Sequence, residues 1–170
     1  MKNLLTLTTL LLLATLTLTS CGSDEPAVST TATATYSITF SPDLLDACNV
    51  FIIYKAENGR NVQEAVTTPT WTKTVTSNRF PAEFGVQYTF STKSDAELDK
   101  EKYDLQCDFH FEVKTSKGAY YANNTPVLSS TGLARNKVVD YLGRNSGTST
   151  GYRVSENGIV SEAKNLNYNI

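Results

Sequence analysis

The chain has 170 residues, of which 40% are hydrophobic, and its 15 basic and 17 acidic residues give a formal net charge of -2. This mild acidity, without a basic cluster, argues against a nucleic-acid-binding protein and against polybasic lipid binding. A chain of this length can bury enough surface for one hydrophobic core without a metal staple.

The amino-terminal residues predict a secretory signal. Lys2 gives a basic start, and the apolar run that follows ends at Leu18-Thr19-Ser20-Cys21. A basic start, an apolar stretch of roughly 7–15 residues and a small-residue cleavage site make up such a signal. The run is shorter than the roughly 20 residues of a membrane-spanning helix, and acidic residues follow it. We therefore expect cleavage rather than a transmembrane anchor.

Leu18-Thr19-Ser20-Cys21 also resembles the lipobox of bacterial lipoproteins. The resemblance implies that the signal peptide, residues 1–20, is removed and that Cys21 carries lipid chains such as palmitate, which anchor the protein to the outer membrane. Asp24 and Glu25 resemble an acidic export signal that one phylum of Gram-negative anaerobes uses for surface lipoproteins. The implied location is the cell surface, and the alternative is an anchor that faces the periplasm.

The composition changes after the lipid cysteine. Residues 21–35 contain almost no large apolar side chain, which predicts a flexible tether that adds nothing to a core. Residues 36–170 are expected to form a single domain.

Short segments rich in Val, Ile, Tyr, Phe and Thr recur in this domain and are separated by Gly, Pro, Asn and Asp. This pattern predicts a mainly all-β fold, an antiparallel β-sandwich with one or two short helices. The strands are expected at Tyr36–Ser41, Cys48–Ala56, Asn61–Val66, Trp71–Ser77, Gly85–Lys93, Tyr103–Thr115, Ala119–Ala122, Tyr152–Ser155 and Ile159–Glu162, with an edge strand at Asn165–Ile170. The pairs Asn58-Gly59 and Asn157-Gly158 are expected to close tight hairpins.

The strand at Tyr103–Thr115 has the clearest pattern. Apolar and polar residues alternate along it, which indicates one face in the core and one in water. The expected core face is Leu105, Cys107, Phe109, Phe111 and Val113.

Two segments predict helices. Ser94 and Glu97 fit a capping box that would begin a helix reaching about Lys102. A second apolar stripe, formed by Ala134, Val138, Tyr141 and Leu142, has helical spacing and ends at Gly143. A strand through Val138 and Val139 is the alternative for the second segment.

Cys48 and Cys107 remain after the lipid cysteine, each on the apolar side of a β segment. Outside the cytoplasm such a pair can be oxidised, and closing a loop of about 60 residues stabilises by about 4 kcal/mol in the chain-entropy model. The alternative is two buried thiols that pack as small hydrophobic groups.

The order Cys48, Trp71, Cys107 and the position of Tyr103 resemble immunoglobulin-like domains. Trp71 lies farther from Cys48 than the family pattern allows, and Tyr103 precedes Cys107 by four residues rather than two. The resemblance therefore implies an immunoglobulin-like β-sandwich in the general sense, and not the antibody family.

No residue pattern predicts catalysis. Residues 147–151 match Gly-x-Ser-x-Gly, but they lack the strand before and the helix after that a nucleophile elbow requires, and the only histidine, His110, precedes them. Asp108, His110 and Glu112 share a strand face, which a solvated surface explains without a metal. We expect no cofactor, no metal and no enzymatic activity.

Exposed aromatic residues are the remaining resource for binding. Tyr120 and Tyr121 are adjacent, so their rings point to opposite faces of a strand, and Asn123 and Asn124 lie in the loop expected at residues 123–126. Exposed tyrosines contact sugar rings or protein partners. These four residues are the expected ligand contacts of a lipid-anchored binding module with a glycan or protein partner. The alternative is an accessory subunit of a surface complex or fimbria, joined through its edge strands.

Overall fold

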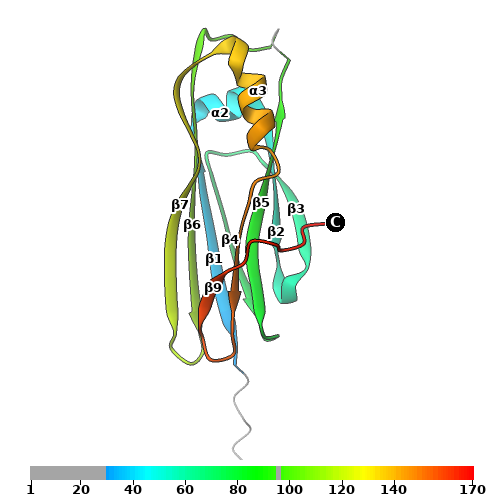
Figure 1. Ribbon diagram of the computed structural model, residues 1–170, viewed down its shortest axis with the longest axis vertical. Coiled ribbons are helices and arrows are strands. Elements are labelled where there is room, and N and C mark those ends of the chain that lie inside the picture. Colours follow the sequence, from blue (N-terminus) through cyan, green and yellow to red (C-terminus); the bar gives the residue numbers. More distant parts are fainter. Residues whose placement is uncertain (1–29, 95–96) are drawn as a thin grey trace, which may run out of the picture.

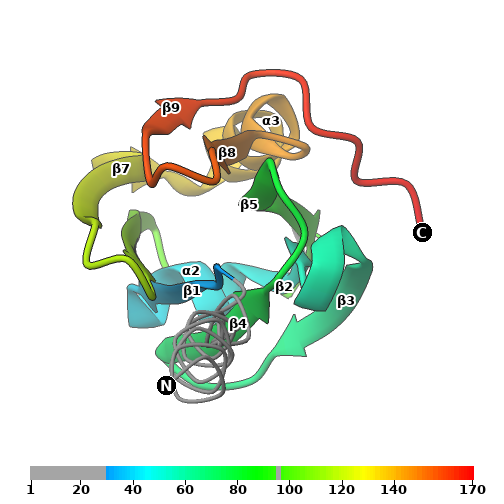
Figure 2. The same cartoon turned by 90° about the horizontal axis from the view of Figure 1, so that it is seen from below.

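The computed structural model describes residues 30–94 and 97–170. Two antiparallel sheets pack face to face, which confirms the mainly β sandwich (Figures 1 and 2). Sheet A has the strand order β4-β1-β6-β7, and sheet B has the order β3-β2-β5-β8-β9. The strands are β1 Ala32–Phe40, β2 Cys48–Lys55, β3 Asn61–Val66, β4 Thr70–Ser77, β5 Ala82–Thr92, β6 Lys102–Thr115, β7 Tyr120–Ala134, β8 Ser149–Val154 and β9 Val160–Glu162.

The core between the sheets is built largely from aromatic rings. The alternation expected for β6 is confirmed, since its five apolar residues are at most 1% exposed. Phe111 of β6 stacks on Tyr152 of β8 with ring centroids 4.2 Å apart and planes 5° from parallel. Tyr36 of β1 stacks within sheet A on Phe109 and Phe111, with centroids 6.4 and 5.9 Å apart, and contacts Tyr54 of β2 in sheet B, with centroids 6.2 Å apart. Aromatic contacts between the two layers therefore fix their separation and their relative position.

Strand β1 begins earlier than the sequence predicted. The tether was expected to extend to residue 35, but Ala32 and Ala34 lie inside the sandwich with no exposed surface. Both pair with β4 and β6 on either side. The expectation that this stretch adds nothing to the core is wrong because a central strand between bulky neighbours accepts small side chains.

The two α-helices of residues 30–94 and 97–170 lie at the end of the sandwich opposite the start of β1 (Figure 1). Helix α2, Pro42–Ala47, was missed by sequence analysis although Ser41 caps it and Pro42 occupies its first turn. Helix α3, Arg135–Asn145, confirms the helix predicted from the apolar stripe, and Val138 and Leu142 of that stripe are buried. Within the described residues, no helix combines the length and the apolar character needed to cross a membrane.

The helix expected from Ser94 to Lys102 is wrong for its described part. The capping hydrogen bond exists, because Ser94 N donates to Glu97 Oε2 at 2.9 Å. The residues from Glu97 to Glu101 form only turns and irregular backbone, Leu98 is buried, and β6 begins at Lys102. Residues 95–96 lie outside the described residues.

Strand β7 is much longer than expected. It runs for 15 residues beside β6 and includes residues 123–126, so the predicted loop is wrong. The register shifts between Cys107 and Asp108, opposite Leu128 and Pro126. An edge strand tolerates proline and bulges, which is why turn-forming residues could be accommodated here.

The predicted edge strand at Asn165–Ile170 is also wrong. Residues 163–170, here called the C-terminal strap, form no strand and cross the outer face of sheet B (Figures 1 and 2). The first hairpin is confirmed, because Asn58 and Gly59 have φ angles of 56° and 79° between β2 and β3. They lie in the short 3-10 turn Glu57–Gly59.

Candidate functional site

Strand β7 carries all four residues that the sequence predicted as ligand contacts, but it places them on two different surfaces. Tyr120 and Asn124 point outward from sheet A, and Tyr120 is 59% exposed. Tyr121 and Asn123 point toward the gap between the sheets and are half-buried. Since alternate residues of a strand face opposite ways, a single ligand does not contact all four.

On the outward surface, the polar groups satisfy one another. His110 Nδ1 lies 2.6 Å from Asn124 Oδ1, and Nε2 lies 3.2 Å from Glu112 Oε1. Tyr120 Oη donates to the same Glu112 oxygen at 3.3 Å, and Lys114 Nζ lies 5.5 Å from the centroid of the Tyr120 ring. The hydrogen bonds that Asn124 Oδ1 and then Glu112 Oε1 accept from the protonated ring raise the pKa of His110.

The side chains of His110, Glu112, Tyr120 and Asn124 therefore form a network of hydrogen bonds with one another. No group of three His, Cys, Asp or Glu side chains that could hold an ion occurs among the described residues. His110 in sheet A is separated from Ser149 in sheet B, so this histidine is not placed beside the Gly-x-Ser-x-Gly serine.

Tyr152 forms the floor of a cleft at the lateral edge where β7 faces β8 and β9, and Tyr121 and Asn123 of β7 pack against this tyrosine. The rings of Tyr121 and Tyr152 lie 5.6 Å apart. Asn123 Nδ2 donates to Tyr152 Oη at 2.9 Å and to Thr125 Oγ1 at 3.4 Å. Burial raises the pKa of Tyr121, and Tyr152 and Glu162 nearby add to the effect. The floor is therefore rigid, hydrogen-bonded and uncharged.

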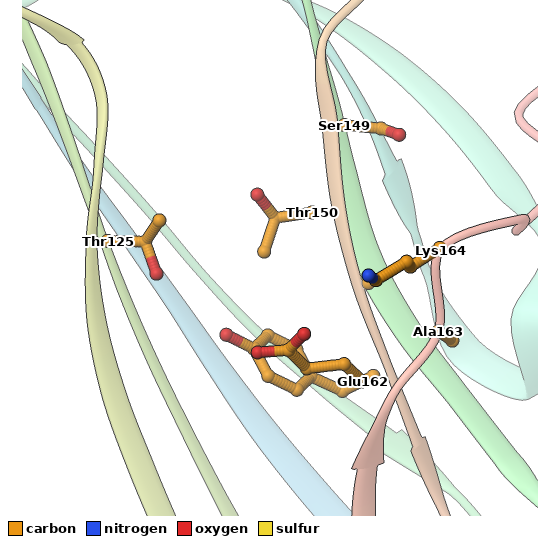
Figure 3. A pocket seen from close by; sticks show the side chains of 8 residues that line it. Thr125, Ser149, Thr150, Glu162, Ala163 and Lys164 are labelled. Atoms are coloured by element: carbon orange, nitrogen blue, oxygen red, sulfur yellow. The ribbon is translucent and has the colours of Figure 1, made fainter.

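Polar side chains form the walls of this cleft, which encloses about 260 Å³. Figure 3 shows Thr125 on one side and Thr150, Glu162 and Lys164 on the other. Glu162 and Lys164 are exposed, and within the described part of the chain the side chain of neither makes a hydrogen bond or an ion pair. The cleft therefore offers a free carboxylate, a free ammonium group and hydroxyls above an aromatic floor.

Tyr121 and Asn123, predicted from the sequence, support the floor of this cleft through Tyr152, but none of the residues that line the cleft was among the four predicted ligand contacts. Thr150, Tyr152, Glu162 and Lys164 come from β8, β9 and the strap, which lie beside β7 only after the two sheets pack. The predicted hairpin around Asn157-Gly158 located these strands in the sequence. Nothing in the residue pattern indicated which edge of the sandwich they would form.

The cysteines contribute nothing to this cleft. Cys48 and Cys107 are buried and free in the structure, so the disulfide considered from the sequence is not formed there. Cys48 Sγ donates to Leu44 O at 3.2 Å, and burial raises the pKa of its thiol to about 12. Cys21 lies outside the described residues.

No family model matches this chain, and no curated protein matches it.

Proposed function

We propose that this protein is a lipid-anchored lipoprotein of the outer membrane, exposed at the cell surface, whose sandwich is a non-catalytic binding module. The observation that carries the binding role is the cleft between β7 and β8–β9, where Glu162 and Lys164 have no partner in the described chain. A charged group without a partner at the mouth of a rigid pocket is available to a ligand at little cost in reorganisation.

A neutral sugar residue fits the chemistry of this cleft best. The carboxylate of Glu162 and the ammonium group of Lys164 balance in charge, so the site favours a ligand with no net charge. The hydroxyls of Thr125 and Thr150 and the carboxylate supply donors and acceptors for several hydroxyl groups at once. The Tyr152 ring lines the same cleft and adds an apolar contact.

The lipid anchor is supported by Leu18-Thr19-Ser20-Cys21 and by the place where the domain begins. Strand β1 starts at one end of the sandwich, so the anchor attaches at the end opposite α2 and α3 (Figure 1). Cells that produce the protein should incorporate labelled palmitate into it and retain it in the envelope. Cys21→Ser should abolish both, and protease added to intact cells should degrade the wild-type protein if it is exposed at the surface.

The binding role is tested with the chain from residue 22 on a glycan array, followed by titration of any hit. Glu162→Gln keeps the shape of the side chain and removes its charge, so we expect affinity to fall about 10- to 100-fold, as for loss of a charged hydrogen bond. The matched control is Glu156→Gln, an exposed glutamate in the turn between β8 and β9 that does not line the cleft. Equal affinity of the two variants would exclude the cleft as the site.

We infer that the sandwich resembles immunoglobulin-like domains in its general architecture and not in the tryptophan and disulfide that are typical of antibody domains. Tyr103 Oη accepts a hydrogen bond from Lys100 N at 3.0 Å, so its hydroxyl binds the backbone just upstream, as in a tyrosine corner. In contrast, Trp71 lies on edge strand β4 and donates to Glu64. This tryptophan does not cover a disulfide between the sheets as in antibody domains.

A role as an accessory subunit of a surface complex is the second proposal, and strand β4 is the observation that favours it. This edge strand pairs with β1 at eight consecutive positions without a register shift and contains no proline. Such an edge can accept a strand from another chain. Native purification with cross-linking should then recover a stoichiometric partner, and Thr72→Lys with Thr74→Lys on the exposed face of β4 should weaken its retention.

A further inference from the structure

The outer face of sheet B holds a second built site, which lies under the C-terminal strap. Gly85 of β5 and Gly151 of β8 are direct neighbours in the sheet, and together they leave a shallow trough. A Cβ atom on Gly85 would collide with Tyr168 Oη, and one on Gly151 would lie 2.6 Å from Leu166 Cδ1. Glycine in the middle of a strand is destabilising, by roughly 0.5–1 kcal/mol relative to alanine. The trough therefore serves to receive the side chains of the strap.

Side chains beside the trough hold the backbone of the strap. Lys55, only 5% exposed, donates through Nζ to Asn167 O. Asn61 Nδ2 donates to Asn167 O at 3.2 Å and to Asn169 O at 2.6 Å. Because these bonds go to main-chain carbonyls, they recognise an extended peptide whatever its side chains.

Two side chains of the strap give the site its selectivity. Tyr168 is 6% exposed, its hydroxyl donates to Thr150 O at 3.1 Å, and Lys55 Nζ lies 5.5 Å from its ring centroid. Leu166 covers Gly151. The pattern that fits is a large apolar residue, any residue, and then a tyrosine.

The strap is attached by few main-chain contacts. Ala163 N donates to Gly151 O at 2.8 Å, and the strap takes no part in the strand pairing of sheet B. Detachment would leave the ladders of the sheet intact. It would also remove the carbonyl partner of Lys55 and expose the buried Tyr168 ring to water, which is costly. An empty trough is therefore unfavourable, but few contacts require that the peptide in it comes from the same chain.

We propose that the trough over Gly85 and Gly151 is a peptide-binding site that the C-terminal strap of a second copy of this chain can fill in place of the chain's own strap. The second copy offers the same Leu166, Tyr168 and carbonyl groups, so every contact named above is reproduced between chains. The chain's own strap has the advantage of an effective concentration of about millimolar order. Exchange therefore becomes appreciable where copies are held close together.

Cysteine pairs on two different copies detect this exchange directly. A chain with Asn61→Cys is mixed with a chain with Asn169→Cys, both from residue 22 and both otherwise native, and mild oxidation follows incubation at high concentration. A disulfide between the two introduced thiols forms only when the strap of one chain lies on the sheet of the other. We expect a cross-linked heterodimer that increases with incubation time and protein concentration. The control replaces Asn169→Cys by Lys117→Cys, an exposed residue in the turn between β6 and β7.

A second measurement uses a fluorescent peptide of residues 163–170. We expect it to bind a full chain carrying Leu166→Ala and Tyr168→Ala at least tenfold more tightly than the wild type, whose own strap competes. Ile170→Ala, at the exposed end of the strap, should behave as wild type. No heterodimer above the Lys117→Cys control, or equal peptide affinity of the folded double variant and the wild type, would overturn the proposal. Both readouts are independent of any ligand in the cleft, so they remain valid if the glycan proposal fails.

Discussion

Each lateral edge of the sandwich carries a glutamate, and the two glutamates differ in whether their carboxylates have partners. Where β3 meets β4, Glu64 Oε1 accepts hydrogen bonds from Tyr54 Oη at 3.0 Å and Lys73 Nζ at 2.9 Å, and Oε2 accepts one from Trp71 Nε1 at 3.0 Å. Where β7 faces β8 and β9, Glu162 has no such partner in the described chain. The first carboxylate joins two sheets, and the second is left for a ligand.

Packing at the two edges follows the same division. At the β3–β4 edge, the Trp71 ring lies 6.5 Å from Tyr36 and 5.3 Å from Tyr54, and Trp71 is 8% exposed. At the opposite edge, Tyr121 contacts Phe111 but stays half-buried beside a cleft. An edge whose carboxylate is fully paired contributes to stability, whereas an edge whose charged groups are unpaired contributes less to stability and can bind a ligand. We expect substitutions to separate these two contributions.

The largest difference should come from the aromatic residue of each edge. Trp71→Ala removes a nearly buried ring and the donor to Glu64, so it should lower the free energy of unfolding by about 3–5 kcal/mol. Tyr121→Ala removes a ring that is already partly in water and should cost roughly half as much. Urea denaturation of both variants measures the difference. Similar losses would mean that the two edges are equally structural.

The glutamates of the two edges should also differ in their contribution to the free energy of unfolding, by a smaller amount than the aromatic residues. Glu64→Gln weakens three hydrogen bonds to one side chain and should cost about 1–3 kcal/mol. Glu162→Gln should change the free energy of unfolding by less than about 0.5 kcal/mol, as expected for a surface position without partners. The same denaturation series provides both values. A loss of stability for Glu162→Gln comparable to that for Glu64→Gln would mean that the Glu162 carboxylate has partners within the protein.

The contribution of Glu64 should also depend on pH in a defined direction. Burial alone would raise the pKa of this carboxyl, but hydrogen bonds from Lys73, Trp71 and Tyr54 hold it below its usual range. A lowered folded-state pKa gives stability that is present above the unfolded pKa of about 4.3 and is lost as the pH falls through the folded value. The difference in unfolding free energy between wild type and Glu64→Gln should be constant near neutrality and shrink in acid. A difference that grows on acidification would refute the network.

Local patterns in the sequence predicted the elements whose geometry is decided locally. The alternation in Tyr103–Thr115 and the pair Asn58-Gly59 identified β6 and the first hairpin, since period two and positive φ act over a few residues. The prediction for the segment that forms β7 was wrong because Asn123, Asn124 and Pro126 favour turns on their own. Pairing with the long β6 overrides that preference.

The sequence indicated only residues that support the candidate site. Tyr121 and Asn123 stood out as aromatic and polar residues on one strand, and they hold Tyr152 at the floor of the cleft. The residues that line the cleft come together through the order β5-β8-β9 in the other sheet, and no residue pattern specifies that order. The same limit applies to Gly85 and Gly151, whose pairing becomes meaningful only beneath the strap.

The smallest expected effect is a change in the pKa of His110 of β6, which contacts Asn124 on the outer face of β7. It tests whether this face is independent of the cleft on the other side of the strand. His110 faces an oxygen at each ring nitrogen, and only the protonated imidazole can donate to both, so the hydrogen bonds to Asn124 and Glu112 raise its pKa. A raised pKa gives stability that is fully present below the unfolded value of about 6.5 and is lost as the pH rises through the folded value. An NMR titration of this single histidine should show a pKa above 6.5, and Asn124→Ala should bring it down. Asn123→Ala, which acts on the cleft side of the same strand, should leave the titration unchanged, and a shift there would mean that the two faces of β7 are coupled.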